Sequence, residues 1–203
     1  MLRFVSLGIE LLTSLAVLVP AYFLFRFFGG KAMAVKRKAL LFLFVLWGLA
    51  IFSITGLPNL HFHTFDLNLN LIPFRGLIEA PVQYVLNIIL FLPIGFMAAL
   101  LWENFRNMKN IFLLGLGLSL FIELAQIFTF RATDIDDLIA NTFGAVLGYL
   151  LTTPFQKKKQ SAVITSTVSI EEYILFGTVL LGTLLIQPLL SDFLWSLALP
   201  IVF

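Results

Sequence analysis

The feature that most constrains the fold of this chain is a series of six apolar runs, each long enough to cross a bilayer as a helix. A spanning helix needs about 20 mostly apolar residues, because each residue advances it by about 1.5 Å. The runs cover roughly residues 4–28, 39–57, 84–102, 111–130, 135–153 and 173–190. Only 12% of the residues are charged, whereas a typical soluble domain has about 25%. The sequence therefore predicts an all-α, polytopic membrane helix bundle of about six transmembrane helices.

The two ends of the chain allow alternatives to a simple series of spans. The first run could be a cleaved signal peptide, but only Arg3 precedes it. The basic residues that follow it are Lys31, Lys36, Arg37 and Lys38. A signal peptide has the reverse arrangement and a shorter apolar core, so we expect a retained span. The apolar tail at 193–203 is too short to span again, and we expect it to lie at the membrane interface.

Basic residues set an orientation for these spans. The segments 26–38, 103–110 and 156–160 hold all seven lysines together with Arg26, Arg37 and Arg106. Cytoplasmic loops carry an excess of lysine and arginine, so these segments are predicted to lie inside. The loops 58–83 and 131–134 then lie outside, and so do both termini.

No internal repeat or low-complexity tract divides the chain, and we predict one membrane domain with three parts. Residues 1–57 form an N-terminal helix pair, residues 58–155 a core of one outer loop and three helices, and residues 156–203 a basic inner loop with a C-terminal helix. The net charge of +2, without a basic-aromatic motif, does not favour nucleic acid as a partner. The chain has no cysteine, and His61 and His63 are too few for a histidine-rich metal site.

Polar residues in the outer parts of the spans and in the two outer loops gather on the predicted outer side. This set comprises Glu10, Arg75, Glu79, Gln83, Asn87, Glu123, Gln126, Arg131, Asp134, Asp136, Asp137 and Asn141. A charged side chain at the centre of a membrane helix costs about 2.5–3.5 kcal/mol, and less toward its ends. Acids at such depth usually have partners inside the bundle, so Glu10 and Glu123 should point inward. The sequence thus predicts an outward-facing polar site.

Small residues predict how two of the helices pack. In the run 111–130, Gly115, Ser119 and Glu123 recur every four residues and so lie on one helix face. The run 135–153 has a matching series beside Asn141, at Ala140, Gly144 and Gly148. Small residues let helix backbones approach closely. Because the connection between these runs is short, we expect an antiparallel hairpin with the two small-residue faces together.

The densest group of charges is R-A-T-D-I-D-D at residues 131–137. A helix begins there, so an aspartate could simply cap its N-terminus for about 0.5–2 kcal/mol. Three aspartates so close together repel one another. We therefore expect an offsetting partner, which could be Arg131, Arg75, a metal ion or a cationic ligand. Glu123, Asp136 and Asp137 are weak candidates for holding a divalent cation such as Mg²⁺ or Ca²⁺; no other cofactor is predicted.

Two further features lie near this group. Apolar and polar residues alternate at 67–70, which predicts an extended segment. Within the run 84–102, Pro93 could kink the helix, which would widen the outer half of the bundle. It could also simply be tolerated, as prolines often are in membrane helices.

Four blocks of sequence carry a resemblance to a known family. They are N-L-I-P-F-R at 70–75, N-I-I-L-F-L-P-I-G-F at 87–96, S-L-F-I-E-L-A-Q at 119–126 and R-A-T-D-I-D-D-L-I-A-N-T-F-G-A-V-L-G at 131–148. In these blocks the chain resembles the VanZ-like family of bacterial membrane proteins. The resemblance implies a bacterial plasma membrane and a role at its outer surface, because the family's namesake is associated with low-level resistance to the glycopeptide teicoplanin. The residues it marks are Asn70, Pro73, Phe74, Arg75, Asn87, Pro93, Gly95, Glu123, Gln126, Arg131, Asp134, Asp136, Asp137, Asn141, Gly144 and Gly148.

Three functions remain open from the sequence. In the first, the polar site binds an outer-leaflet amphiphile, such as a lipoglycopeptide, a lipid-linked precursor or a membrane phospholipid. Arg75 and Arg131 would hold phosphate or carboxylate, and the aspartates and Glu123 would orient the arginines or accept from an amine. In the second, the protein is an intramembrane enzyme that acts on a lipid-linked substrate by metal-assisted hydrolysis or phosphoryl transfer, although no nucleophile-base pair is evident. The third, a transporter, ranks lower because there is no internal repeat and the polar groups lie off-centre.

Overall fold

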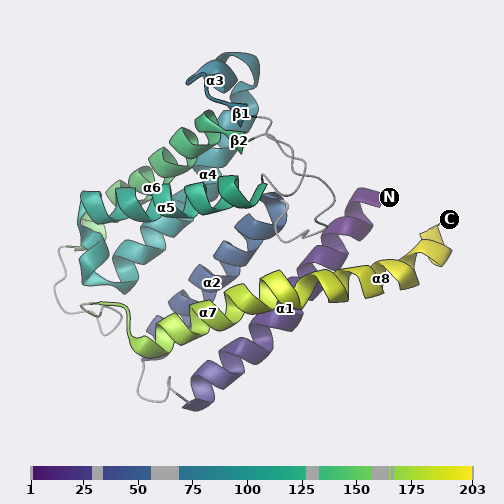
Figure 1. Cartoon of the computed structure of the whole chain (residues 1–203). Coiled ribbons are helices and arrows are strands. Elements are labelled where there is room, and N and C mark those ends of the chain that lie inside the picture. Colours follow the sequence, from purple (N-terminus) through teal and green to yellow (C-terminus); the bar gives the residue numbers. More distant parts are fainter. Residues whose placement is uncertain are drawn as a thin grey trace.

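The computed structural model describes residues 2–28, 34–55, 69–126, 133–156, 165 and 167–202. Helices dominate the described residues, and the chain order is clear in Figure 1. The long helices are α1 (Leu2–Phe28), α2 (Val35–Thr55), α4 (Pro81–Leu101), α5 (Met108–Gln126), α6 (Ile135–Gln156), α7 (Ile170–Leu185) and α8 (Gln187–Val202). The short elements are strands β1 (Leu69–Asn70) and β2 (Thr133–Asp134), helix α3 (Arg75–Glu79) and the 3₁₀ turn η2 (Glu103–Arg106).

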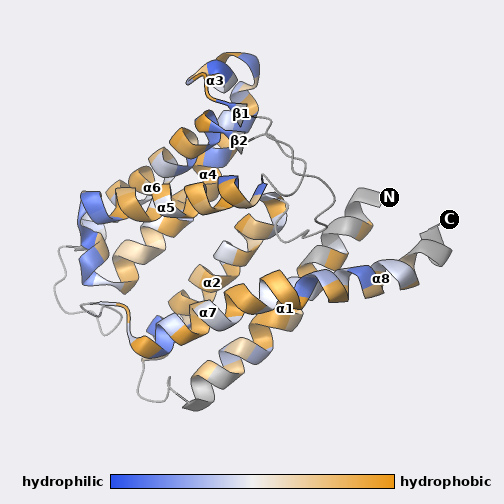
Figure 2. Ribbon diagram, in the orientation of Figure 1, coloured by the Kyte–Doolittle hydropathy of each residue, from blue (hydrophilic) through white to orange (hydrophobic). Residues whose placement is uncertain are grey.

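The helices α4, α5 and α6 form one side of the molecule, and α1, α7 and α8 lie on the other, with α2 between them (Figure 1). Figure 2 shows hydrophilic residues around α3, β1 and β2, at the η2 turn and the start of α7, and along part of α8. We call the end with β1, β2, α3 and the first turns of α4 and α6 the acidic end. We call the end with η2 and the first turns of α2, α5 and α7 the basic end.

The α5–α6 hairpin has the predicted antiparallel form. A Cβ built on Gly115 would lie 2.8 Å from the Cβ of Ala145 in α6. One turn further along α5, Ser119 Oγ accepts a hydrogen bond of 2.9 Å from Asn141 Nδ2. The face of α5 that carries the small residues therefore contacts α6, as predicted.

The predicted partner of Gly144 and Gly148 was wrong. A Cβ at Gly144 would collide with the carbonyl oxygen of Ile88, and one at Gly148 with that of Leu92, both in α4. The close approach is mutual, because a Cβ built on Gly95 of α4 would collide with the carbonyl oxygen of Ala145 in α6. The helices α4 and α6 thus run in the same direction with their backbones in contact. Small-residue spacing predicts a close approach, but α6 has two neighbours and the spacing does not choose between them.

Among the described residues, α2, α4 and α5 are long and apolar enough to cross a membrane. The helices α7 and α8 are apolar enough only when taken together, and their 42° bend fits either a broken span or a re-entrant loop. The chain is therefore a membrane protein by the length and composition of these helices, with three or four candidate spans. The prediction of six spans and of the side on which the termini lie is not confirmed.

The sixth predicted span, 173–190, is not one continuous helix, because the helix breaks inside it. The helix α7 ends at Leu185, and α8 continues from Gln187 through most of the tail that was expected to be separate. Pro188 accounts for the break, since it has no N–H to donate and its ring clashes with the preceding turn of a helix.

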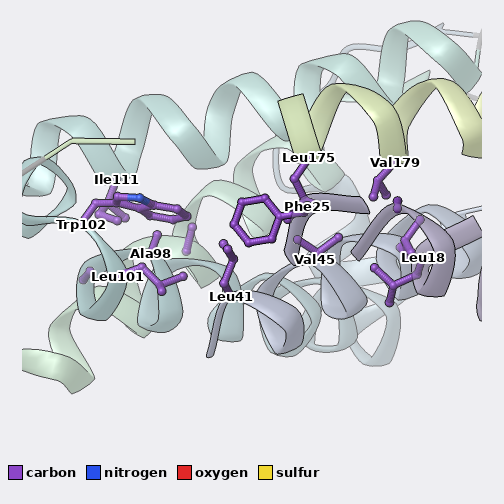
Figure 3. Close-up of a cluster of buried hydrophobic side chains, with 14 residues drawn as sticks. Leu18, Phe25, Leu41, Val45, Ala98, Leu101, Trp102, Ile111, Leu175 and Val179 are labelled. Carbon is purple, nitrogen blue, oxygen red and sulfur yellow. The ribbon is translucent and has the colours of Figure 1, made fainter. Parts of the chain in front are cut away.

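The apolar core lies between the two sides of the molecule. It includes Leu18 of α1, Leu41 of α2, Leu101 of α4 and Leu175 of α7, and Trp102 follows α4 at its basic end (Figure 3). Between helices that lie in lipid, such side chains contribute mainly through van der Waals packing, because lipid tails are as apolar as leucine. The core joins α1 and α7 to the α4–α6 unit through α2.

Candidate functional site

A short parallel strand pair joins two distant segments at the acidic end. Leu69 pairs with Thr133, and Asn70 with Asp134. The side chain of Asn70 adds a hydrogen bond from its Nδ2 to Asp134 Oδ2, at 3.0 Å. The extended conformation predicted for 67–70 is confirmed at residues 69 and 70; residues 67 and 68 lie outside the described part of the chain.

Asp134 caps α6, which is one of the two interpretations that the sequence allowed. Its Oδ1 accepts the backbone N–H of Asp136 at 2.9 Å. Its own backbone N–H donates to Glu123 Oε2, also at 2.9 Å. Glu123 is only 3% exposed, so the prediction that it points into the bundle is confirmed. The side chain of Glu10, predicted to do the same, lies outside the described part of the structure.

Asp136 is held by backbone N–H groups. Its two carboxylate oxygens accept from Phe74 N and Gly76 N, each at 2.5 Å. Phe74 has a φ of 66°, in the left-handed region that few non-glycine residues adopt. A left-handed residue followed by a right-handed one turns successive N–H groups to the same side, which favours an anion there. The 2% exposed carboxylate of Asp136 fills that concavity.

Arg75 does not offset the aspartates as expected. It forms an ion pair with Glu79, one turn along α3, with 2.9 Å between Nε and Oε1. Both side chains are at least half exposed. Arg131, the other arginine predicted to hold an anion, lies outside the described residues. The negative charge of Asp136 is stabilised by the dipoles of backbone N–H groups, which sequence composition does not reveal.

Asp137 faces α4 instead of the loop. Its Oδ1 accepts from Asn87 Nδ2 at 2.6 Å. Nearby, Gln126 Nε2 donates to the carbonyl oxygen of Thr55 at 3.0 Å, which ties the last turn of α5 to the last turn of α2. Asn87, Gln126 and Asp137 are thereby brought to one place, whereas Asn141 lies a turn deeper in α6 on Ser119.

These residues line a groove of about 810 Å³ along α2 and α4. Its polar lining consists of Thr55, Glu79, Gln83, Asn87, Gln126 and Asp137. Its apolar lining consists of Trp47, Ile54, Ala80, Pro81, Val82, Leu86, Ile89 and Leu90. The groove is therefore polar at the acidic end and apolar along the helices, and its volume is typical of a small-molecule site.

The sequence model of the VanZ/LLP1 family matches residues 38–156, more than half of the chain. The chain belongs to the VanZ/LLP1 family. The match begins in α2, so it is longer than the predicted core of 58–155 and takes in every residue that lines the groove. No curated protein and no solved structure matches the chain.

The acids of this VanZ/LLP1 protein are not grouped around a common point. Glu123 is bonded to Asp134 N, Asp136 to the Phe74 loop and Asp137 to Asn87. Among the residues that the structure describes, no three Asp, Glu, His or Cys side chains are placed to hold a metal ion. The divalent-cation site predicted at Glu123, Asp136 and Asp137 thus stays a prediction.

Sequence reasoning missed Trp47, which lines the groove and donates from Nε1 to the carbonyl oxygen of Leu90 at 2.8 Å. Pro93 lies one turn further along α4, but the carbonyl that its missing N–H leaves free is that of Ile89, four residues back, and not that of Leu90. Membrane helices often satisfy carbonyls near a proline with neighbouring side chains. The helix itself continues through Pro93 to Leu101.

Sequence reasoning also missed a buried ion pair at the basic end. Arg37 Nη2 lies 2.5 Å from Glu172 Oε1, and both side chains are almost completely buried. Trp102 Nε1 donates to the other carboxylate oxygen at 2.9 Å. The sequence marks Arg37 only as one of the basic residues of the predicted inner segment 26–38. The sequence does carry one signal for Glu172, since Ser169 and Glu172 form the S-x-x-E capping box of α7.

Proposed function

We propose that this VanZ/LLP1 protein lies in a bacterial plasma membrane with its acidic end outside and binds an amphiphile from the outer leaflet in the α2–α4 groove. The observation that carries the proposal is the lining of the groove. A polar head group would lie among Glu79, Gln83, Asn87 and Asp137, and an acyl chain would follow Leu86 and Leu90 along the helix.

The orientation follows from the distribution of charge. Among the described residues, the basic end has Lys36, Arg37, Lys38, Arg106 and Lys109. Positive charge marks the cytoplasmic side of membrane proteins. With that end inside, the polar part of the groove opens at the level of outer-leaflet head groups. The association of the VanZ-like family with low-level teicoplanin resistance supports a role at this surface in the cell envelope.

Binding, and not catalysis, is the function that the arrangement supports. The acids at this end are used to fix the chain: they cap α6, hold the Phe74 loop and bond to Asn87. An enzyme would need a reactive group and its partner within hydrogen-bond reach of a substrate. The groove contains acceptors and amides, which position a ligand.

The test is native mass spectrometry of the full chain extracted from bacterial membranes, looking for a retained amphiphile. Leu86 is half exposed and lines the groove, so Leu86→Trp should fill it and remove the ligand. Leu113→Trp makes the same change at a similarly exposed position of α5 and should retain the ligand. Equal retention by both variants, or no ligand in any form, would contradict the proposal.

The same variants test the link to resistance. Expression of the wild-type chain or of Leu113→Trp in a susceptible bacterium should raise the inhibitory concentration of teicoplanin. Leu86→Trp should not, because the groove is blocked. If all three proteins had the same effect, resistance would be separate from the groove.

A further inference from the structure

A second groove, of about 630 Å³, lies between α5 and α6, and we call it the α5–α6 groove. Phe112 and Leu116 of α5 line it together with Leu138 and Val146 of α6. Thr142 also lines it, but its hydroxyl oxygen is buried and presents almost no polar surface to the groove. Among the described residues, none lines both this groove and the α2–α4 groove. The two grooves are therefore separate places on the molecule.

The α5–α6 groove is long and narrow along the helix axes. Its lining extends from Lys109, at the basic end, to Leu138, which is closer to the acidic end. The hydrogen bond between Ser119 and Asn141 sets the register of the antiparallel pair. In that register Lys109 and Leu138 are about 20 Å apart along the axes, at about 1.5 Å per residue. Half of a bilayer's hydrocarbon core is about 15 Å deep, so the groove has the length of one acyl chain.

The rim of the α5–α6 groove is open to the membrane. Met108, Phe112 and Phe143 line the groove and are each about half exposed. Large apolar side chains that remain exposed on a membrane-spanning helix face lipid tails. A lipid can therefore enter this groove sideways from the bilayer, without crossing a polar surface.

The charge at one end of the α5–α6 groove is positive. Lys109 lies in the first turn of α5, is exposed, and is the one charged residue among the described residues that line the groove. The described ion pairs join Arg37 to Glu172 and Arg75 to Glu79, and none involves Lys109. A lysine ammonium binds phosphate as a point charge. Basic pockets between membrane helices bind anionic head groups in the same way.

We infer that the α5–α6 groove binds a phospholipid with a net anionic head group, taken from the leaflet at the basic end. Its phosphate lies at Lys109, and one acyl chain follows Phe112 and Leu116 toward Leu138. This site is additional to the α2–α4 groove and its outer-leaflet amphiphile. With the orientation proposed above, the lipid belongs to the inner leaflet. The contacts themselves are the same whichever side of the membrane the basic end faces.

Competition between two lipids tests the role of Lys109. The full chain in mild detergent is incubated with equal amounts of phosphatidylglycerol and phosphatidylcholine that have the same acyl chains, and native mass spectrometry measures the ratio of the two complexes. For the wild type we expect phosphatidylglycerol to be favoured about fivefold, the effect of one lysine near a head group. Lys109→Gln should reduce the ratio to about one. Lys36→Gln removes the same charge from an exposed position at the same end, outside the groove, and should keep the ratio.

A second pair of variants tests the groove itself. Leu116→Trp should fill it and reduce both lipid complexes, whereas Leu113→Trp, at an exposed position of α5 that does not line it, should retain them. Circular dichroism checks that both variants keep the helical content of the wild type. Leu86→Trp blocks the α2–α4 groove and should leave the lipid ratio unchanged, so the two sites are tested independently.

Four results would overturn the inference. Equal binding of the two lipids by the wild type would remove the selection for an anionic head group. An equal fall in Lys36→Gln and Lys109→Gln would assign the attraction to the basic end as a whole. Phosphatidylglycerol retained by Leu116→Trp would place the lipid elsewhere. A lipid-free dimer of the wild type that Leu116→Trp dissociates would show that a second copy of the chain occupies the groove.

Discussion

The two ends of the bundle bury acids in different ways. At the basic end, Glu172 is paired with Arg37 and covered by Trp102, so the charges are closed off from any ligand. At the acidic end, Asp136 is satisfied by backbone N–H groups, and Asp137 by an amide at the edge of a groove. In a buried ion pair the two opposite charges neutralise each other. At the acidic end, neutral peptide groups stabilise the carboxylate of Asp136 without supplying an opposite charge.

The largest effect that separates the two ends is expected at Glu172. Glu172→Gln leaves the buried guanidinium of Arg37 without its counter-ion, which should cost about 3–5 kcal/mol of unfolding free energy. Unfolding in detergent micelles, followed by circular dichroism against denaturant, measures it. The neighbouring Glu171 is exposed in the first turn of α7, where hydrogen bonds lower the pKa of its carboxyl, so Glu171→Gln should lower the midpoint far less than Glu172→Gln. Similar midpoints for both variants would mean that the pair does not hold the basic end together.

A smaller and more local effect is expected at Asp136. Asp136→Ala removes the acceptor of two backbone N–H groups, which should cost about 2–3 kcal/mol. Hydrogen exchange of residues 70–79 should rise, while that of η2 at the other end stays as it was. Asp136→Asn keeps one acceptor oxygen and should give an intermediate rate. Unchanged exchange in this segment would show that the carboxylate does not hold the Phe74 loop.

The smallest effect is expected at the exposed ion pair of α3. Arg75→Gln should cost about 0.5 kcal/mol or less, and the difference should vanish at high salt. Arg37→Gln, the same substitution in the buried pair, should be several times more costly and insensitive to salt. Equal costs would remove the distinction between the two ends.

The sequence predicted the features that depend on local pattern. Apolar runs located the long helices, and the short connection between two of them predicted the α5–α6 hairpin. The cost of an unpaired acid in a membrane predicted that Glu123 points inward, and its position before a helix made Asp134 a candidate cap. Each of these inferences needs only a segment of chain and its immediate surroundings.

The features that the sequence did not predict depend on which elements lie next to one another in the folded chain. Gly144 and Gly148 had two possible neighbours, and the spacing of small residues is the same for both. Arg37 and Glu172 are 135 positions apart, and no periodicity relates them. The backbone N–H groups that hold Asp136 are present in every peptide, so only the left-handed conformation of Phe74 makes them an anion site.

The contact between α4 and α6 has a mechanical consequence for the groove. Carbonyl oxygens of one helix occupy the places where side chains of the other would begin, so these two helices cannot slide past each other without separating. The α4 wall of the groove is thus a fixed reference surface. The width of the α2–α4 groove depends on the position of α2. Two hydrogen bonds hold α2 against α4, one from Arg37 to the carbonyl oxygen of Leu101 and one from Trp47 to that of Leu90. An occupant bulkier than the groove would displace α2 and strain those two hydrogen bonds first.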